Sequence, residues 1–185
     1  MKKIKKIIIG THNKGKYKEI SSLLPASIQK LSPKELNLPS PKETGLNFKE
    51  NSILKSKFFS KKSGLICISD DSGLEIDILN GDPGIYSARW AGINNDFNLA
   101  INKVFHALSK KDQNWSKKNI SARFICSLTV FWPDGKNITT EGIINGNISS
   151  FIRGTKGFGY DPIFIPLGHK KTFSEMEPKL KYNID

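Results

Sequence analysis

The sequence predicts a mixed α/β fold, with strand–helix units in the first half of the chain and an antiparallel section in the second. Three segments carry apolar side chains at helical spacing, and we expect helices over residues 14–24, 47–61 and 95–108. Short β-branched or apolar runs predict strands over residues 3–9, 28–31, 65–69, 120–132, 138–148 and 163–165. A Pro-Asp-Gly turn at residues 133–135 separates the two longest strands and is typical of a hairpin.

The first strand and the first helix have clear boundary signals. Gly10 ends the strand, Thr11 and Asn13 offer side chains that cap a helix, and Pro25 closes the helix. Where a helix begins directly after a strand and a glycine, its free backbone N–H groups and its dipole favour an anion. This segment is therefore a candidate anion site. The second helix has Gly64 as its stop.

A chain of 185 residues can bury a hydrophobic core without disulfides, and it predicts one domain or two small lobes that share a cleft. Its two cysteines, Cys67 and Cys126, lie inside apolar runs with no motif spacing. We therefore expect buried, reduced thiols and a cytoplasmic protein. The basic N-terminus is followed by an apolar run that is too short for a signal peptide or a membrane span.

The net charge of +12 comes with 26 lysines and only 3 arginines. A charge of this sign invites a nucleic-acid-binding module, but the lysines are scattered and no arginine-rich block occurs. A compositional bias toward Lys, Ile and Asn explains the charge as well, and a positive field favours anionic small substrates in either case. We expect no stable nucleic-acid partner and no membrane partner.

The segment THNKGK, Thr11–Lys16, could bind phosphate at the start of the first helix. It lacks the glycine spacing and the Lys-Ser/Thr pair of a P-loop. Thr11 and Asn13 can still hydrogen-bond phosphate oxygens, and Lys16 can supply a point charge. The alternative is a simple helix cap with solvated lysines.

The segment from Lys42 to Lys57 places an acid before a helix. Glu43 precedes a Thr-Gly turn, and Asn51 and Lys55 lie one turn apart on one face of the second helix. A loop acid beside such a face could hold a metal ion and phosphates. An ordinary surface helix is the alternative, and we expect Lys16 and Lys55 on exposed faces.

Two adjacent acids, Asp70 and Asp71, follow the apolar run at residues 65–69. Side chains alternate along a strand, so at its carboxyl end one acid can face a cleft while the other supports it from behind. Paired carboxylates are costly unless a cation or hydrogen bonds offset their repulsion. Mg²⁺ bound with substrate phosphates would do so, and a general base could lie here too. The alternative is a turn that merely favours Asp and Ser-Gly.

The segment GTKGFGYDP, residues 154–162, is a glycine-rich aromatic loop. Phe158 and Tyr160, between glycines, are expected to offer exposed ring faces, and rings beside an Asp suit a purine base. A packed aromatic loop is the alternative.

Taken together, five blocks resemble the inosine triphosphate pyrophosphatase family, whose members hydrolyse non-standard purine nucleoside triphosphates. The blocks are T-x-N-x-x-K, ETGLNFKENSILKSK, SDDSGLEIDILNGDPGIYSARWAG, GTKGFGYDPIF and TFSEMEPKLK. They occur in the family's order from the first strand to the C-terminus, and the long central block is highly specific. The resemblance implies an elongated α/β protein with two lobes around a central nucleotide-binding cleft on a mixed sheet. It also implies a homodimer.

The resemblance further implies the roles of individual residues. Asp71 would be the catalytic base and, together with Glu43, a ligand of Mg²⁺, while Asp70 would support the site from beside them. The substrate-binding residues implied are Thr11, His12, Asn13, Lys14, Gly15, Lys16, Lys55, Ser72, Phe158, Gly159, Tyr160, Asp161 and Lys181. The loop at 158–161 would bind the base, and the lysines near the first two helices would contact the triphosphate.

The sequence departs from the family at its end. In the family, the segment after EMEPKLKYNI continues through a Ser-His-Arg triplet that reads the 6-oxo purine, whereas this sequence stops at Asp185. His169 lies in an upstream turn and is no substitute. We expect a single nucleotide pyrophosphatase domain over residues 1–185 that is truncated at its C-terminus; the alternative is a protein without part of its base reader.

The expected function is Mg²⁺-dependent hydrolysis of ITP, dITP and XTP to the monophosphate and pyrophosphate, which removes these nucleotides from the pool. Two other functions stay open from the sequence. One is a related pyrophosphatase for other modified nucleotides, and the other is a basic nucleic-acid-binding module.

Overall fold

A computed structural model describes residues 4–184 of the chain. These residues divide into two compact units. Unit 1 comprises the described residues up to Asp71 together with Cys126–Glu141, and unit 2 comprises Ser72–Ile125 and the described residues from Gly142 onward. Lys3, the expected start of the first strand, and the base-reading segment expected after Asp185 lie outside the described residues.

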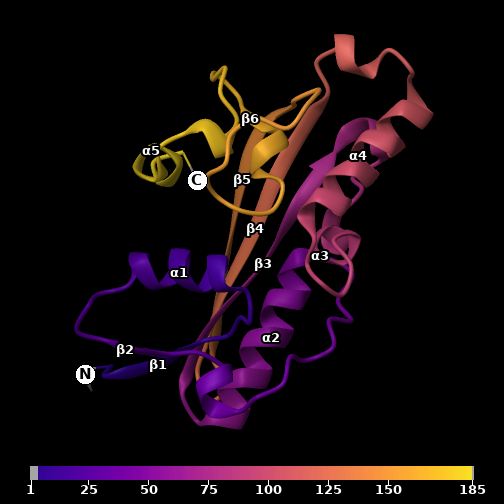
Figure 1. Cartoon of the computed structure of the whole chain (residues 1–185). Coiled ribbons are helices and arrows are strands. Elements are labelled where there is room, and N and C mark those ends of the chain that lie inside the picture. The colour runs from indigo at the N-terminus through magenta and orange to yellow at the C-terminus, as the bar shows by residue number, and fades with distance from the viewer. Residues whose placement is uncertain (1–3, 185) are drawn as a thin grey trace. The chain divides into compact units, whose positions relative to one another are not determined.

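Six strands form a mixed sheet in the order β2-β1-β3-β4-β5-β6. Their bounds are β1 Lys6–Ile9, β2 Gln29–Leu31, β3 Ile66–Ile76, β4 Ser121–Phe131, β5 Asn137–Ile148 and β6 Phe164–Pro166. Strand β1 pairs with β2 and β3 in parallel, whereas β5 and β6 are antiparallel, so the predicted class is confirmed (Figure 1). The predicted hairpin turn joins β4 to β5, where the Trp132 N–H donates to the Lys136 carbonyl at 2.8 Å.

Five α-helices occur among the described residues, and the predicted signals Asn13 and Gly64 cap the first and end the second. The helices are α1 Lys14–Leu23, α2 Phe48–Ser63, α3 Ser87–Trp90, α4 Phe97–Lys111 and α5 Pro178–Tyr182. The side chains of Asn13, Asn47 and Asp96 cap α1, α2 and α4 by accepting backbone N–H groups. Gly64 ends α2 in the left-handed conformation, with a φ of 69°. The short helices α3 and α5 were not expected from the sequence. No described helix has the length and apolar character needed to cross a membrane.

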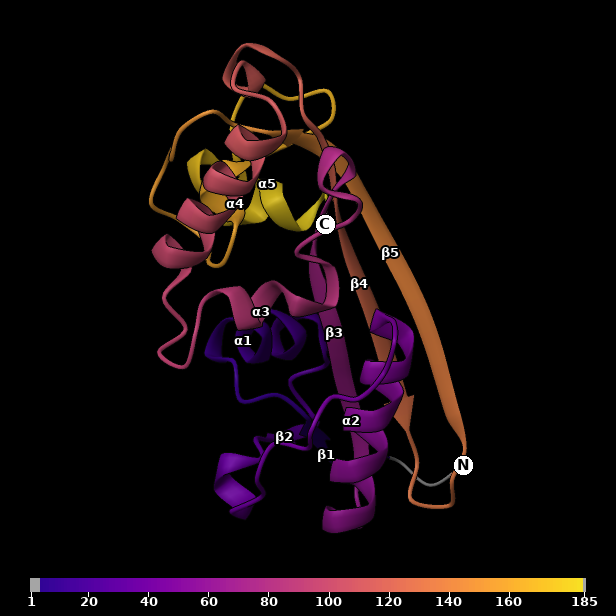
Figure 2. The same ribbon diagram turned by 90° about the vertical axis from the view of Figure 1, so that its right-hand side faces the viewer.

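In unit 1, helices α1 and α2 cover opposite faces of the sheet. Ile20 of α1 packs with Ile9 and Ile68, while Phe59 of α2 packs with Ile8 and Cys67. Both views place α1 and α2 on either side of β3 (Figures 1 and 2). Because side chains alternate along a strand, neighbouring residues of β3 point to different helices.

Unit 2 has the larger apolar core, which forms around one face of α4. The buried α4 residues Ala100, Ile101, Val104 and Leu108 cluster with side chains from the strand ends in this unit. Among those side chains are Leu74 and Ile76 of β3, Ile148 of β5, Phe164 of β6 and, beyond the sheet, Phe173.

Two expectations about the segments around the cysteines and the acids were wrong. Strand β3 does not end at Ser69 but continues through the acid pair to Ile76, because Leu74 and Ile76 bury apolar side chains in unit 2 and keep the segment extended. Ser-Gly is therefore not a turn here. Cys67 is buried as predicted, but Cys126 is exposed, since it points away from the buried face of β4.

Candidate active site

Asp70 and Asp71 lie within β3, at the end of the part that belongs to unit 1. Both are almost fully buried, with exposed fractions of 4% and 6%. Asp70 shares the face of Ile68, which α1 covers, and Asp71 shares the face of Cys67, which α2 covers. The prediction that the two acids project to opposite sides is thus confirmed, although they lie in mid-strand.

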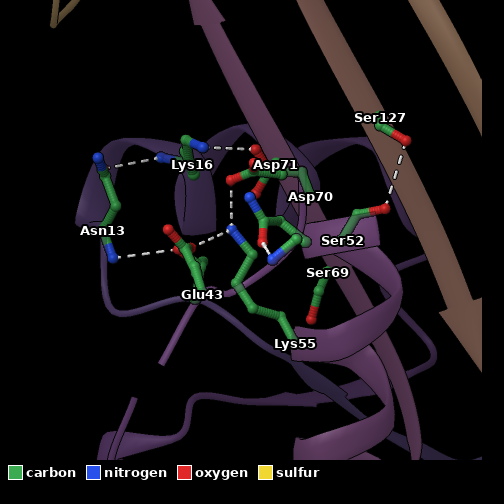
Figure 3. A network of polar contacts seen from close by, with 12 residues as sticks. Asn13, Lys16, Glu43, Ser52, Lys55, Ser69, Asp70, Asp71 and Ser127 are labelled. Carbon is green, nitrogen blue, oxygen red and sulfur yellow. Dashed lines mark hydrogen bonds and ion pairs between the residues drawn. The ribbon is translucent and has the colours of Figure 1, made fainter. Parts of the chain in front are cut away.

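On the first face, Asp70 pairs with Lys16 of α1. The Lys16 Nζ lies 2.7 Å from the Asp70 Oδ2 (Figure 3). The start of α1 is held by Asn13, whose Oδ1 accepts the N–H groups of Gly15 at 2.8 Å and Lys16 at 3.2 Å. The Thr11 Oγ1 accepts the Asn13 N–H at 3.1 Å. The buried Asp70 thus fixes the position of Lys16, which the sequence predicts to lie beside an anion site.

On the second face, the ammonium of Lys55 lies between two carboxylates. Its Nζ is 2.8 Å from the Glu43 Oε1 and 2.7 Å from the Asp71 Oδ1 (Figure 3). The Lys55 side chain is only 13% exposed, so the expectation that it lies on an exposed face was wrong. The side chain is drawn inward because two acids, one from a loop and one from β3, meet at its end.

The ionisation of this pair follows from its burial. Burial lowers the pKa of Lys55, but the charges of Asp71, Asp70 and Glu43 outweigh that effect, so its pKa lies above the usual value and the ammonium stays charged. Burial raises the pKa of Asp71, and the charge and hydrogen bond of Lys55 oppose the rise without cancelling it. A carboxylate whose pKa is raised binds a proton more readily, which suits Asp71 to accepting one.

The loop that carries Glu43 is fastened to α2. The Gly45 N–H donates to the Asn51 Oδ1 at 2.8 Å, and a Cβ at Gly45 would lie 2.7 Å from that oxygen. Only glycine allows this approach, and the bond holds Glu43, two residues earlier, beside Lys55. The Asn51–Lys55 face of α2 is therefore buried and polar, not an ordinary surface face.

The carboxylates of this cluster fit a divalent metal ion. The Asp71 Oδ2 is buried and has no hydrogen-bond partner among the described residues, although the Oδ1 of the same group binds Lys55. Within residues 4–184, no group of three or more His, Cys, Asp or Glu side chains is placed to hold a metal by itself. Mg²⁺ needs only one or two carboxylates when waters and substrate phosphates complete its shell, so Glu43 and Asp71 suffice.

A second group of predicted site residues lies in unit 2, around the loop that precedes β6. The Asp161 Oδ2 accepts the Phe158 N–H at 2.9 Å and the Lys181 Nζ at 2.9 Å. The Lys181 Nζ also lies 5.0 Å from the centre of the Phe158 ring. Structure therefore brings Phe158, Asp161 and Lys181 together within this unit, although 20 residues separate Asp161 from Lys181.

The Tyr160 ring is not exposed, contrary to expectation. It is 2% exposed, packs edge-on against Phe97, and donates its hydroxyl to the Ser87 carbonyl at 2.9 Å. Burial raises its pKa, so the hydroxyl stays protonated. Gly159, directly before Tyr160, has a φ of 67°, a left-handed conformation that lets the backbone turn the ring into the core. Phe158 is only partly buried.

The hydroxyl groups that join α2 to the hairpin were not predicted from the sequence. The Ser52 Oγ lies 2.8 Å from the Thr129 Oγ1 and 3.3 Å from the Ser127 Oγ, and the Thr129 Oγ1 lies 2.8 Å from the Thr139 Oγ1. Ser52, Ser127 and Thr129 are fully buried. The signal was the spacing of serines 52, 56 and 60, which places small side chains on one helix face and allows close packing.

Comparisons with known proteins support a nucleotide-related site. The model of the Ham1 family matches residues 7–185. A protein of Rhodospirillum centenum named dITP/XTP pyrophosphatase is 44% identical over 179 residues, covering 96% of this chain and 87% of that protein. One of Caulobacter vibrioides with the same name is also 44% identical, covering 95% of this chain and 89% of its own. The solved Ham1 protein from Coxiella burnetii superposes with a TM-score of 0.86 at 34% identity, covering 98% of this chain and 92% of that one.

Proposed function

Because the chain belongs to the Ham1 family, we propose that it hydrolyses non-standard purine nucleoside triphosphates, namely ITP, dITP and XTP, to the monophosphate and pyrophosphate. The observation that carries this proposal is the buried cluster of unit 1, in which Lys55 bridges Glu43 and Asp71 while Lys16 holds Asp70. Relatives at 44% identity carry the name dITP/XTP pyrophosphatase, which supports the same activity for this chain.

The charges of the cluster suit a metal–triphosphate ligand. The cluster combines three acidic side chains with two lysines, an excess of one acid, which favours a divalent cation. We propose Mg²⁺, held by Glu43 and Asp71; when bound it would neutralise charge on the phosphates. Lys16 and Lys55 could then turn their ammonium groups toward the phosphates, beside the free N–H groups at the start of α1.

Asp71 is proposed as the general base. Its Oδ1 is occupied by Lys55, whereas its Oδ2 has no hydrogen-bond partner among the described residues and can accept a proton from water. The water oxygen would form a bond to the α-phosphorus in line with the leaving group, the bond from that phosphorus to the bridging oxygen would break, and pyrophosphate would leave with the electron pair.

Unit 2 is proposed to bind the base through Phe158, Gly159, Tyr160, Asp161 and Lys181, with a further substrate contact from Ser72. The partly buried Phe158 ring supplies a stacking face, and Lys181 supplies a donor for an oxygen of the base. Tyr160 would shape this loop from the core, since its hydroxyl is already engaged. A homodimer and a cytoplasmic location are also proposed, the latter because the two cysteines, Cys67 and Cys126, lie in apolar runs without motif spacing.

A pyrophosphate-release assay over ITP, dITP, XTP, GTP, ATP and UTP, each with and without Mg²⁺, tests the proposal. We expect turnover of the first three, little turnover of GTP and ATP, and loss of turnover on chelation. A pocket built to donate to a 6-oxo group rejects the 6-amino group of ATP because a buried donor would be left unpaired. Preferred turnover of UTP would favour a pyrophosphatase for other nucleotides, and no turnover of any nucleotide would refute the proposal.

A further inference from the structure

Asn51 of α2 has an amide whose orientation is fixed and whose donor is unused. Its Oδ1 accepts the Gly45 N–H, so the other amide atom must be the NH₂ group. The side chain is fully buried, and its Nδ2 has no hydrogen-bond partner among the residues that the structure describes. A buried amide donor without a partner destabilises the folded state. This cost favours a role for the donor in binding a group that arrives with the substrate.

The position of Asn51 ties it to the candidate catalytic centre. It lies one helical turn before Lys55, whose ammonium contacts Glu43 and Asp71. Its own amide holds Gly45, two residues beyond Glu43. Another buried side-chain atom of this unit without a hydrogen-bond partner among the described residues is an acceptor on Asp71, the Oδ2.

A water molecule complements both atoms at once. Its oxygen can accept a hydrogen bond from the Asn51 Nδ2, one of its protons can be donated to the Asp71 Oδ2, and one lone pair remains for attack. We propose that Asn51 is a catalytic residue that binds and orients the attacking water through Nδ2, in addition to fastening the Glu43 loop through Oδ1. This inference rests on the proposed function. The water gives its proton to Asp71 as its oxygen bonds to phosphorus and pyrophosphate departs; Asn51 itself exchanges no proton.

Asn51→Asp separates the two roles of the side chain. The carboxylate keeps an acceptor for the Gly45 N–H but offers the water a second acceptor in place of the donor. At saturating Mg²⁺ we expect kcat for ITP to fall about a hundredfold, as on removal of one preorganised donor, while KM changes little. Asn102→Asp, an exposed site on α4 in unit 2, makes the same change of charge and should retain the kcat of the parent. Parent-like kcat in Asn51→Asp, or a raised KM at unchanged kcat, would overturn the proposal.

A measurement on the unmodified protein covers the case in which Asn51→Asp does not fold. The side-chain amide of Asn51 is followed by NMR after selective ¹⁵N-asparagine labelling, with Mg²⁺ and the uncleavable α,β-methylene analogue of ITP as the probe. We expect its NH₂ resonances to shift and to exchange more slowly with solvent when the site is loaded. If the backbone amides of Glu43 and Lys55 shift while the Asn51 side chain does not, Asn51 contacts no bound group and the proposal is wrong. If none of these resonances shifts, the cluster does not bind the phosphates, and the proposal for Asn51 is wrong as well. If the resonances shift but the parent protein releases no pyrophosphate, the proposed function is wrong.

Discussion

At the scale of single residues, the centre of unit 1 consists of acids that form ion pairs with two lysines. Asp71 shares one oxygen with Lys55 and keeps the other without a hydrogen-bond partner among the described residues, which makes it the residue on which the proposed chemistry depends most. Asp70 has a different surrounding, since its partner Lys16 belongs to α1 on the other face of the sheet. Two adjacent residues of one type therefore have separable roles.

Asp71→Asn should lower kcat for ITP by about a hundredfold or more, because the amide keeps the shape of the side chain but removes a ligand charge and the general base. Pyrophosphate release at saturating Mg²⁺ measures the effect. Asp70→Asn should lower kcat less, since Asp70 acts by holding Lys16. Asp134→Asn, in the exposed hairpin turn, is the matched control. Normal turnover by folded Asp71→Asn would remove Asp71 from the mechanism.

The two thiols should differ sharply in reactivity. Burial raises the pKa of Cys67 to about 12, so at pH 8 only about one Cys67 thiol in ten thousand is ionised, and its side chain is fully buried. Cys126 is exposed. Iodoacetamide at pH 8 should therefore modify Cys126 alone in the native protein and both thiols in urea, as read by peptide mass spectrometry. Native labelling of Cys67 at a rate close to that of Cys126 would show that β3 opens readily.

At the scale of elements, the three longer helices and most strands could be predicted because their signals are local. Apolar spacing together with Asn13 and Gly64 fixes α1 and α2 within two or three residues of their observed ends. The end of β3 could not be predicted, since the Asp-Asp-Ser-Gly run reads as a turn and only packing in unit 2 keeps it extended. Local composition says nothing about such packing.

The candidate site shows the same limit. The alternation of side chains along a strand predicts that Asp70 and Asp71 point to opposite faces of the sheet. It does not predict which lysine each acid contacts, because that depends on which helix covers which face. The Tyr160 ring illustrates the converse: the glycines before it suggest an open loop, yet the left-handed Gly159 lets the ring turn into the core. The sequence places Asn51 beside Lys55 on one helix face. Its hydrogen bond to Gly45, six residues earlier, could not be predicted, because it depends on how the loop folds back onto the start of the helix.

Gly10, at the end of β1, should tolerate no side chain. A Cβ there would lie 2.2 Å from the Ser69 Oγ, 2.6 Å from a Phe59 ring carbon and 2.8 Å from the Cys67 Sγ. Gly10→Ala must displace β3 or α2 and should lower the free energy of unfolding by about 1–3 kcal/mol, measured by urea titration. Gly142→Ala in β5 is the control, because a Cβ there meets nothing within 4 Å. Equal stability of the two variants would mean that β1 and β3 separate at little cost.

At the scale of the whole molecule, unit 1 is assembled from distant parts of the chain. The β4–β5 hairpin, Cys126–Glu141, belongs to the same unit as the N-terminal strands, and buried hydroxyl contacts from Ser52 to Thr129 and Ser127 join it to α2. These contacts span 75 and 77 residues of sequence. The helix that carries Lys55 is thus held from one side by the hairpin and from another by the Gly45 bond.

The net charge of +12 is a property of the whole molecule, and it is the observation that suggests a basic nucleic-acid-binding module as the alternative to the proposed enzyme. The two lysines of the candidate site are paired with buried acids, so they are not displayed to a duplex. Any binding of DNA must then come from dispersed surface lysines and should weaken steeply with salt, by about 10³-fold or more between 50 and 200 mM for six or more phosphate contacts.

We therefore predict that a random-sequence DNA duplex in excess will not inhibit pyrophosphate release from ITP at 200 mM NaCl. Fluorescence anisotropy of labelled DNA, run beside the hydrolysis assay over the same salt series, measures both properties in one preparation. Hydrolysis should persist at salt concentrations that abolish DNA binding, because the proposed site, with Mg²⁺ and buried carboxylates, would be screened by salt far less than the surface. DNA that stays bound at 200 mM NaCl and displaces the nucleotide would mean that the same lysines serve both ligands, and the basic surface would then be part of the function.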